Sequence, residues 1–337
     1  MMRLPWFDFR APRTIAEAAE ILAGEGPQAM LIAGGTDLVP NMKRRHQTPA
    51  TLVSLRRVEA LRKSNGSLGA CLTLTEIVDS ALIRERYRGL WQAAAQVATP
   101  HLRNMGTLGG NLCLDTRCTY YNQNFEWRQA IDFCLKKEGE TCWVATASKR
   151  CVAVSSTDSA PALIALGARV KLVSSGGERE LALADLYRND GIDYLSRKPD
   201  EILTEVVLPP SGGWKSSYWK LRRRGSFDFP VLGVAAALRF GKDQVIEEAR
   251  IALGAVASRP FLVDKAGAYL AGKKLSDDVI AEAAASVASR AKPMDNTDLD
   301  LYWRKEVVGA YTSYALKELR GDDMGATRLR IARQAPG

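Results

Sequence analysis

The chain has 337 residues, of which 46% are hydrophobic and 25% charged, and this length predicts two or three domains. No run of about 20 apolar residues occurs, which argues against a membrane partner. The N-terminus lacks the apolar core of a signal peptide, so the cytoplasm is the expected compartment. The formal net charge of +9 is spread along the chain, and its densest clusters, 43–45 and 222–224, lie in no nucleic-acid-binding pattern, which argues against a nucleic acid partner.

The first predicted unit is a small βαββ-like subdomain. Residues 14–23 predict its helix, because Thr14 and Glu17 have the spacing of a capping box and Gly24 follows as the expected end. An apolar strand before a pair of glycines and a second strand at 51–55 complete the unit.

A second predicted unit begins near residue 57. Thr73 and Glu76 predict another capped helix after a short strand, and a further helix is expected around 90–98. Residues 151–175 predict strand, turn, helix and strand in that order. The pattern is therefore that of a mixed helix and strand region, interrupted by an irregular stretch rich in cysteine.

The C-terminal part begins after a Pro-Pro and Gly-Gly stretch at 209–216, which predicts a domain boundary. Three strands followed by three helices predict an α+β domain, and the polar tail at 321–337 is expected to be loose or ordered only by a partner. The expected strands are 216–224, 231–240 and 249–257, and the expected helices are 260–271, 277–291 and 299–319. The expected division is 1–56 and 57–210 for two subdomains, an insertion at about 114–153, and 211–320 for the last domain.

Two segments carry a pair of glycines. The first is AGGTDL, starting at Ala33, and the second is TLGGN, starting at Thr107. Glycines after a strand allow the backbone to approach a ligand, and successive N–H groups then bind an anion such as a diphosphate. Two such strand-to-loop segments suggest two halves of one dinucleotide site, although two ordinary tight turns remain the alternative.

Four of the six cysteines fall between residues 118 and 151. They are Cys118, Cys134, Cys142 and Cys151, with 15, 7 and 8 residues between them. These gaps are longer than those of zinc knuckles, and thiolates at irregular spacing suit an iron–sulfur cubane. A loop with incidental buried cysteines remains the alternative. The other two cysteines, 71 and 113, are interpreted as small core residues.

Lys220 ends a short aromatic strand. A cation at this position would stabilise a reduced, anionic cofactor if an electron-accepting ring lay beside it. A solvated lysine on an edge strand is the simpler interpretation of the residue alone.

Four segments together resemble a known family. AGGTDL, RNMGTLGGN, DSAPALIALGA and YWKLRRRGSFDFPVLGVAAAL are similar to the FAD-binding medium subunits of the molybdenum hydroxylases, to which xanthine and carbon monoxide dehydrogenases belong, and the resemblance runs from about residue 4 to about 320. In most of that family the GGN motif passes almost directly to the D-x-A-P segment. Here about 40 residues with the four cysteines intervene, and this insertion resembles the β subunits of the branch that reduces 4-hydroxybenzoyl-CoA.

The resemblance implies a vanillyl-alcohol-oxidase-type FAD fold of two subdomains and a C-terminal α+β domain like that of carbon monoxide dehydrogenase flavoproteins. It implies that Cys118, Cys134, Cys142 and Cys151 bind a [4Fe–4S] cluster. The residues that it implies for FAD are Leu31, Ile32, Ala33, Gly34, Gly35, Thr36, Asp37, Thr107, Gly109, Gly110, Asn111, Asp158 and Lys220.

The resemblance also implies an electron-transfer subunit of a larger complex. The expected partners are a large molybdopterin-binding subunit, a small subunit with two [2Fe–2S] clusters and a ferredoxin-like electron donor, in a dimer of heterotrimers that removes the hydroxyl group of 4-hydroxybenzoyl-CoA. Three alternatives stay open. They are the same subunit for a related aryl-CoA or heteroaromatic substrate, a non-catalytic module with a zinc-stabilised loop, and a free-standing FAD oxidase.

Overall fold

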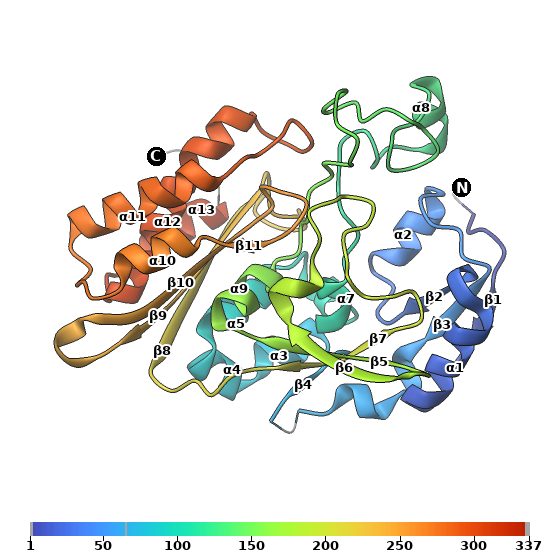
Figure 1. Cartoon of the computed structure of the whole chain (residues 1–337), viewed down its shortest axis with the longest axis horizontal. Helices are drawn as coiled ribbons and strands as arrows, with labels where there is room; N and C mark the ends of the chain where they lie inside the picture. Colours follow the sequence, from blue (N-terminus) through green and yellow to red (C-terminus); the bar gives the residue numbers. More distant parts are fainter. Residues whose placement is uncertain (1–2, 65, 334–337) are drawn as a thin grey trace.

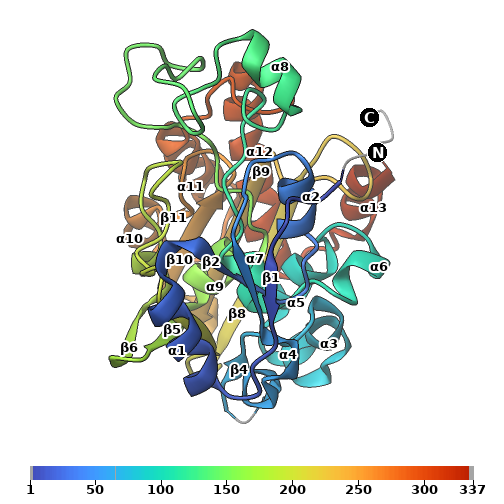
Figure 2. The same cartoon turned by 90° about the vertical axis from the view of Figure 1, so that its right-hand side faces the viewer.

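Three small sheets with their helices make up the computed structural model, which describes residues 3–64 and 66–333 (Figure 1). The N-terminal sheet lies at one side of the molecule and the C-terminal sheet at the other, with the second sheet and its helices between them (Figures 1 and 2). None of the helices in the described part of the chain is long and apolar enough to cross a membrane.

The N-terminal sheet is parallel, with the strand order β1-β3-β2. Thr14 caps the first helix as expected, but the side chain of Glu17 accepts from the N–H of Arg13, so the expected capping box is only half formed. The sequence predicted that the helix ends at Gly24, but it ends at Gly26, because the glycine with a positive φ, of 60°, lies two positions later. The elements are β1 (Asp8–Arg10), α1 (Ile15–Glu25), β2 (Ala29–Ile32), α2 (Leu38–Lys43) and β3 (Thr51–Ser54).

The second sheet is antiparallel, with the strand order β4-β7-β5-β6. The predicted capping box of Thr73 and Glu76 is confirmed at the start of α3. Its strands are β4 (Leu68–Gly69), β5 (Arg169–Ser174), β6 (Gly177–Ala182) and β7 (Ile202–Val207). Its helices are α3 (Leu74–Asp79), α4 (Ala81–Arg86), α5 (Arg88–Ala95), α6 (Pro100–Arg103), α7 (Leu108–Leu112) and α9 (Ser159–Leu166).

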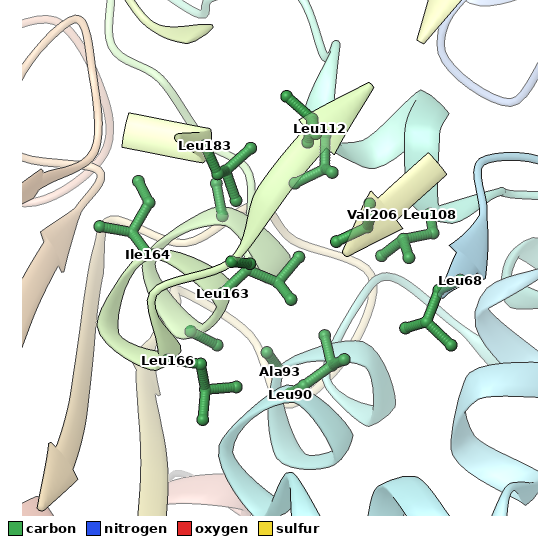
Figure 3. Close-up of a cluster of buried hydrophobic side chains, with 14 of the residues drawn as sticks. Leu68, Leu90, Ala93, Leu108, Leu112, Leu163, Ile164, Leu166, Leu183 and Val206 are labelled. Carbon is green, nitrogen blue, oxygen red and sulfur yellow. The ribbon is translucent and has the colours of Figure 1, made fainter. Parts of the chain in front are cut away.

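Helix α9 is the centre of the main core. All eight of its residues are buried, as expected for a helix that is apolar all round. Leu163 and Leu166 lie among Leu90 of α5, Leu108 of α7 and Val206 of β7 (Figure 3). Burying an aliphatic side chain stabilises the folded state by about 1.5–3 kcal/mol, so this helix fixes the positions of the elements around it.

Two predictions within this region are wrong. The strand expected from residue 151 is an extended segment with one isolated bridge, between Val154 and Arg117. The second glycine pair does not follow a strand as a loop, because Gly109 and Gly110 lie inside α7, where the Thr107 side chain caps the helix by accepting from the N–H of Gly110. No residue pattern predicted a five-residue helix with two glycines at this place.

The C-terminal sheet has the strand order β11-β10-β9-β8 and is buried on both faces. In β9, Ala235 and Ala237 belong to the core around α9, whereas Val234, Ala236 and Leu238 belong to the core under the C-terminal helices, as the alternation of a strand requires. The elements are β8 (Trp214–Leu221), β9 (Leu232–Phe240), β10 (Ile246–Gly254), β11 (Phe261–Leu262), α10 (Asp264–Leu270), α11 (Asp277–Arg290) and α12 (Leu301–Arg320).

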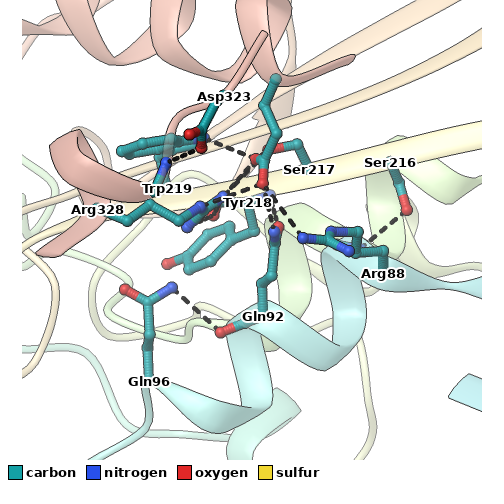
Figure 4. A network of polar contacts seen from close by, with 12 residues as sticks. Arg88, Gln92, Gln96, Ser216, Ser217, Tyr218, Trp219, Asp323 and Arg328 are labelled. Carbon is teal, nitrogen blue, oxygen red and sulfur yellow. Dashed lines mark hydrogen bonds and ion pairs between the residues drawn. The ribbon is translucent and has the colours of Figure 1, made fainter. Parts of the chain in front are cut away.

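The tail was expected to be loose or ordered only by a partner, and this is wrong for its larger part, because Gly325–Arg333 form helix α13. Arg328 of this helix forms an ion pair with Glu318, donates to the carbonyl oxygen of Tyr218 at 3.2 Å and lies over the ring of Trp219 at 3.9 Å (Figure 4). The partner of the tail is therefore within the chain. Residues 334–337 lie outside the described part.

The cysteine-rich insertion stands at one end of the molecule in both views (Figures 1 and 2). Its helix is α8 (Phe125–Ala130), and the rest of it is turns and irregular chain. The hydrogen bonds between the backbones of Arg117 and Val154, at 2.8 and 2.7 Å, close the neck of the insertion.

Candidate functional site

A cavity of about 690 Å³ lies where the N-terminal sheet, the second region and a loop of the C-terminal domain meet. Its wall includes the loop after β2, helix α7, residues 192–195 and the loop at 227–229. This volume is in the range of sites for small ligands and cofactors, and a site between subdomains is where such ligands usually bind.

The first glycine segment forms one wall of the cavity. A Cβ atom on Gly34 would overlap the carbonyl oxygen of Met105, so only glycine allows these two backbones to touch. Gly35 has φ of 71°, which turns the chain toward α2. A Cβ atom on Gly106 would lie 3.4 Å from Oγ1 of Thr36, so these two residues are also close together. The structure therefore brings the first segment against the chain that leads into the second.

The second glycine segment forms the adjoining wall. A Cβ atom on Gly109 would lie 2.7 Å from Cβ of Ala70, so the start of α7 packs on the end of β4 without room for a side chain. The Oδ1 atom of Asn111 accepts from Oγ1 of Thr157 at 2.9 Å and from the N–H of Ser159 at 3.1 Å. Because its oxygen is committed in this way, Asn111 can offer only its NH₂ group to a ligand.

Asp37 links the first glycine segment to the neck of the insertion. It forms an ion pair with Arg117 and accepts from Nδ2 of Asn41 at 3.1 Å, and Oδ1 of Asn41 accepts from Arg117 at 3.2 Å. The guanidinium of Arg117 also lies 4.6 Å from the ring centre of Phe229. Burial lowers the pKa of Arg117 to about 10, which leaves it charged at neutral pH.

Asp158 and Lys220 meet behind the cavity wall. Asp158 lines the cavity, and its two oxygens accept from the hydroxyl of Tyr218 at 2.8 Å and from Nζ of Lys220 at 2.9 Å. Lys220 is completely buried and is not among the residues that line the cavity. Burial raises the pKa of Asp158 and lowers the pKa of Lys220, and the attraction between them opposes both shifts.

Of the residues predicted for FAD, the structure therefore places twelve on the wall of one cavity and Lys220 behind it. The twelve are Leu31, Ile32, Ala33, Gly34, Gly35, Thr36, Asp37, Thr107, Gly109, Gly110, Asn111 and Asp158. Nζ of Lys220 donates to the cavity-lining Asp158 and to the carbonyl oxygen of Gln96 at 3.0 Å, so its predicted place beside the cofactor ring stays a prediction.

The four clustered cysteines are all buried free thiols. Cys118, Cys134 and Cys151 pack in one small core with Tyr121 and Ala153. Cys142 belongs to the same neighbourhood, since it is one of the groups that raise the pKa of Cys118 and of Cys151. Burial raises the pKa of Cys118 to about 11 and of Cys151 to about 12, so both are protonated at neutral pH without a ligand.

The backbone around these thiols already donates to sulfur. The pKa of Cys118 is lowered by hydrogen bonds from the backbones of Tyr120 and Tyr121, against the larger effect of burial, and Sγ of Cys151 accepts from the N–H of Ala153 at 3.4 Å. No three His, Cys, Asp or Glu side chains converge on one point within 3–64 and 66–333. Four buried thiols with backbone N–H donors nearby are the donor type that an iron–sulfur cluster uses, and their role as ligands of one cluster stays a prediction.

Residues that the sequence analysis did not single out join the insertion to the cavity. Asp115, Arg117 and Tyr194 line the cavity, and Nζ of Lys136 in the insertion donates to Asp115 at 2.7 Å. The ring of His46 stacks on Tyr121 of the insertion at 4.3 Å. Before Cys118 the sequence shows two charged residues, Asp115 and Arg117, and nothing in their spacing indicated a cavity.

The comparisons with known families cover both halves of the chain. Residues 5–211 match the family described as FAD binding domain in molybdopterin dehydrogenase. Residues 216–319 match the family described as CO dehydrogenase flavoprotein C-terminal domain. The expected fold is therefore confirmed.

Individual proteins give the same result. The FAD-binding subunit of an Escherichia coli aldehyde oxidoreductase is 33% identical over 278 residues, which cover 78% of this chain and 86% of the relative. The medium chain of glyceraldehyde dehydrogenase from Sulfolobus acidocaldarius is 26% identical over 94% of this chain and 99% of its own length. The solved structure of carbon monoxide dehydrogenase from Hydrogenophaga pseudoflava has the same fold, with a TM-score of 0.76 at 24% identity, and the match covers 94% of this chain and 97% of that one.

Proposed function

The chain belongs to the FAD-binding subunits of the molybdopterin dehydrogenases, and from this premise we propose that it is an electron-transfer subunit with FAD in the cavity and a [4Fe–4S] cluster in the cysteine insertion. The observation that carries the proposal is the ion pair of Asp37 with Arg117, which joins the glycine wall of the cavity directly to the residue before Cys118. The two proposed sites are thus neighbours in one chain.

The residues of the cavity wall suit a dinucleotide. The segment from Leu31 to Asp37 and the segment from Thr107 to Asn111 expose backbone next to glycines, and the Asn111 amide presents its donor end. We propose that these backbone N–H groups hold the diphosphate and neighbouring groups of FAD. Asp158 adds an acceptor whose position is fixed by Tyr218 and Lys220.

The cysteines suit a cluster by their chemistry. We propose that Cys118, Cys134, Cys142 and Cys151 lose their protons on binding, because a cluster binds thiolates. The raised pKa values of Cys118 and Cys151 show that burial disfavours these two thiolates when no positive partner is present. When bound, FAD exchanges electrons singly or in pairs and an iron–sulfur cluster exchanges them one at a time. The chain itself supplies the dry, apolar surroundings and the N–H donors to sulfur.

The proposed partners follow from the relatives. The relatives are named as medium chains or FAD-binding subunits, so this chain works within a complex of several subunits. We propose a large molybdopterin-binding subunit, a small subunit with two [2Fe–2S] clusters and a ferredoxin-like donor, in a dimer of heterotrimers. The cytoplasm is the proposed compartment, since the cysteines are free thiols.

The proposed substrate of the complex is 4-hydroxybenzoyl-CoA, on the resemblance of the cysteine insertion. A second candidate is the oxidation of aldehydes, which the 33% identity to the FAD-binding subunit of the Escherichia coli aldehyde oxidoreductase favours. Both substrates would bind on the large subunit. The assembled complex decides between them under anaerobic conditions. An aldehyde substrate should bleach the oxidised flavin by donating electrons, whereas 4-hydroxybenzoyl-CoA should restore the colour of a flavin that has first been reduced, by accepting electrons.

The first test of the proposal is an elemental and cofactor assay of the chain purified without oxygen. The expected result is one FAD and about four irons and four acid-labile sulfides per chain. Zinc in place of iron would support the alternative of a zinc-stabilised loop and would remove the cluster from the proposal. Turnover of the isolated chain with oxygen would support the free-standing oxidase.

A further inference from the structure

Lys136 lies inside the cysteine insertion, between Cys134 and Cys142, on a tight turn. The N–H groups of Lys137 and Gly139 both donate to the carbonyl oxygen of Cys134, at 2.8 and 3.1 Å. The turn therefore holds the backbone of residue 136 close to the thiols. Its neighbour Lys137 is 30% exposed, whereas the Lys136 side chain is 7% exposed.

The ammonium group of Lys136 donates three hydrogen bonds, two to residues at the start of the insertion and one to Gly191 outside it. Nζ donates to Oδ1 of Asp115 at 2.7 Å, to Oγ1 of Thr116 at 2.7 Å and to the carbonyl oxygen of Gly191 at 2.6 Å. The side chain of Asp115 is 5% exposed, so the ion pair is buried on both sides. A buried ammonium is tolerated only when it is paired and hydrogen-bonded in this way.

Two tyrosine rings flank the same ammonium group. Nζ lies 4.8 Å from the ring centre of Tyr121 and 5.2 Å from that of Tyr194. Tyr121 belongs to the core of the cysteines and donates its hydroxyl to Asp115 at 2.9 Å. Tyr194 lines the cavity. Lys136 therefore lies between a residue that packs on the thiols and a residue that faces the cavity.

The acceptors of Lys136 also touch both sites. Asp115 lines the cavity. Gly191 donates its N–H to the carbonyl oxygen of Cys151 at 2.9 Å, and a Cβ atom on Gly191 would lie 2.6 Å from Sγ of Cys151. The positive charge of Lys136 is thus fixed at the boundary between the cysteine core and the cavity wall, because its contacts reach residues of both.

We propose that Lys136 is a positioning residue that holds the cysteine insertion on the wall of the FAD cavity and sets, together with Asp115, the electrostatic potential there. This rests on the proposed function, because it takes the cavity as the flavin site and the insertion as its neighbour. Removing the positive charge makes the flavin harder to reduce, and removing the opposing negative charge makes it easier to reduce.

The test compares the midpoint potential of bound flavin in the full-length protein and in four variants. Lys136→Met is expected to lower the potential and Asp115→Asn to raise it, while Lys136→Arg stays closest to the unmodified protein. Lys137→Met is the matched control, since it removes the adjacent, partly exposed charge, and it is expected to leave the potential unchanged. Hydrogen exchange of the 118–136 and 190–195 backbone is expected to accelerate in Lys136→Met.

If Lys136 and Asp115 had a purely structural role, the midpoint potential would shift in the same direction in Lys136→Met and Asp115→Asn, and both variants would lose flavin. That result would overturn the electrostatic part of the proposal. Unchanged potential and unchanged exchange in Lys136→Met would overturn all of it. If Lys136→Met does not fold, the other two variants still test the proposal. The midpoint potential should rise in Asp115→Asn and should stay close to that of the unmodified protein in Lys136→Arg. Iron and sulfide in the unmodified protein are measured separately, so that loss of the cluster assignment is distinguished from failure of this inference.

Discussion

The cavity wall and the cysteine insertion are built by opposite means. The wall is made of backbone, because Gly34 and Gly109 remove the side chains that would keep its segments apart. The insertion is held by side chains, chiefly Arg117, Lys136 and His46, around a six-residue helix and irregular chain. A change in the wall should therefore act through steric overlap, and a change in the insertion through the loss of a partner or a metal ligand.

Gly34→Val is the change with the largest expected effect on the wall. Its Cβ would overlap the carbonyl oxygen of Met105, which is backbone and cannot rotate away. We expect a loss of about 3 kcal/mol or more in the free energy of unfolding, together with most of the bound FAD. Denaturant titration and flavin content of the purified protein measure the two effects.

The matched control is Gly24→Ala in α1. Nothing lies within 4 Å of a Cβ at this position, so the substitution is expected to stabilise the helix by up to about 1 kcal/mol and to leave FAD unchanged. A flavin content in Gly34→Val equal to that of the control would show that the first glycine segment does not form the FAD site.

Cys134→Ser is the corresponding change in the insertion. A serine hydroxyl is a poor substitute for a thiolate, so we expect the iron and sulfide to fall from about four per chain to near zero while most of the FAD remains. The side-chain volume changes little, which limits the structural effect at this buried position. Cys71→Ser, in the separate core under α1, is the control and should keep its iron. Full iron in Cys134→Ser would remove Cys134 from the ligand set.

The fold was largely predictable from the sequence where local signals agree with packing. The capped helix at Thr73, the strands of the C-terminal sheet and its late helices all carry apolar periodicity that matches their burial. The exposed strand β1 has no apolar residue pattern, so it was expected only as the first strand of the βαββ-like unit, without bounds, and helix α13 is polar and was missed. Their stability comes from pairing with β3 and from the contacts of Arg328, which are distant in the sequence.

The candidate site was predictable only in part. The glycine pairs were visible as motifs, and the structure brings both to one cavity, although the second lies in a helix. The link between cavity and insertion was not predictable, because Asp37 and Arg117 lie 80 positions apart and each is an ordinary surface residue type. Long-range pairing of charges leaves no periodic pattern in a sequence.

Asp37→Asn tests that link directly. Arg117 would lose its carboxylate partner while it remains buried, and we expect a loss of about 3 kcal/mol in the free energy of unfolding. Because the pair joins the two regions, FAD and iron content should fall together. Glu180→Gln, which breaks the exposed pair with Arg169, is the control and should cost less than about 1 kcal/mol. A loss of only one cofactor in Asp37→Asn would show that the two regions are held independently.

His46 gives the smallest effect, and it depends on pH. The residue is 3% exposed, its ring stacks on Tyr121 and its Nε2 lies 3.1 Å from the carbonyl oxygen of Gln123, so it binds the N-terminal subdomain to the insertion. Burial lowers the pKa of His46 from 6.5 to about 4. Between these two values the unfolded chain binds a proton that the folded chain does not, so the free energy of unfolding falls as the pH falls.

We expect this single group to remove about 2 kcal/mol of stability between pH 7 and pH 5, on top of the effects of other groups. His46→Gln removes the titrating group and keeps a polar side chain, so the variant should lose less stability than the unmodified protein over the same range. The measurement is the change in denaturant midpoint between pH 7 and pH 5, compared between the unmodified protein and His46→Gln. His101→Gln, in helix α6, is the control. Equal losses in all three proteins would mean that His46 titrates normally and that the insertion is not anchored through a buried neutral imidazole.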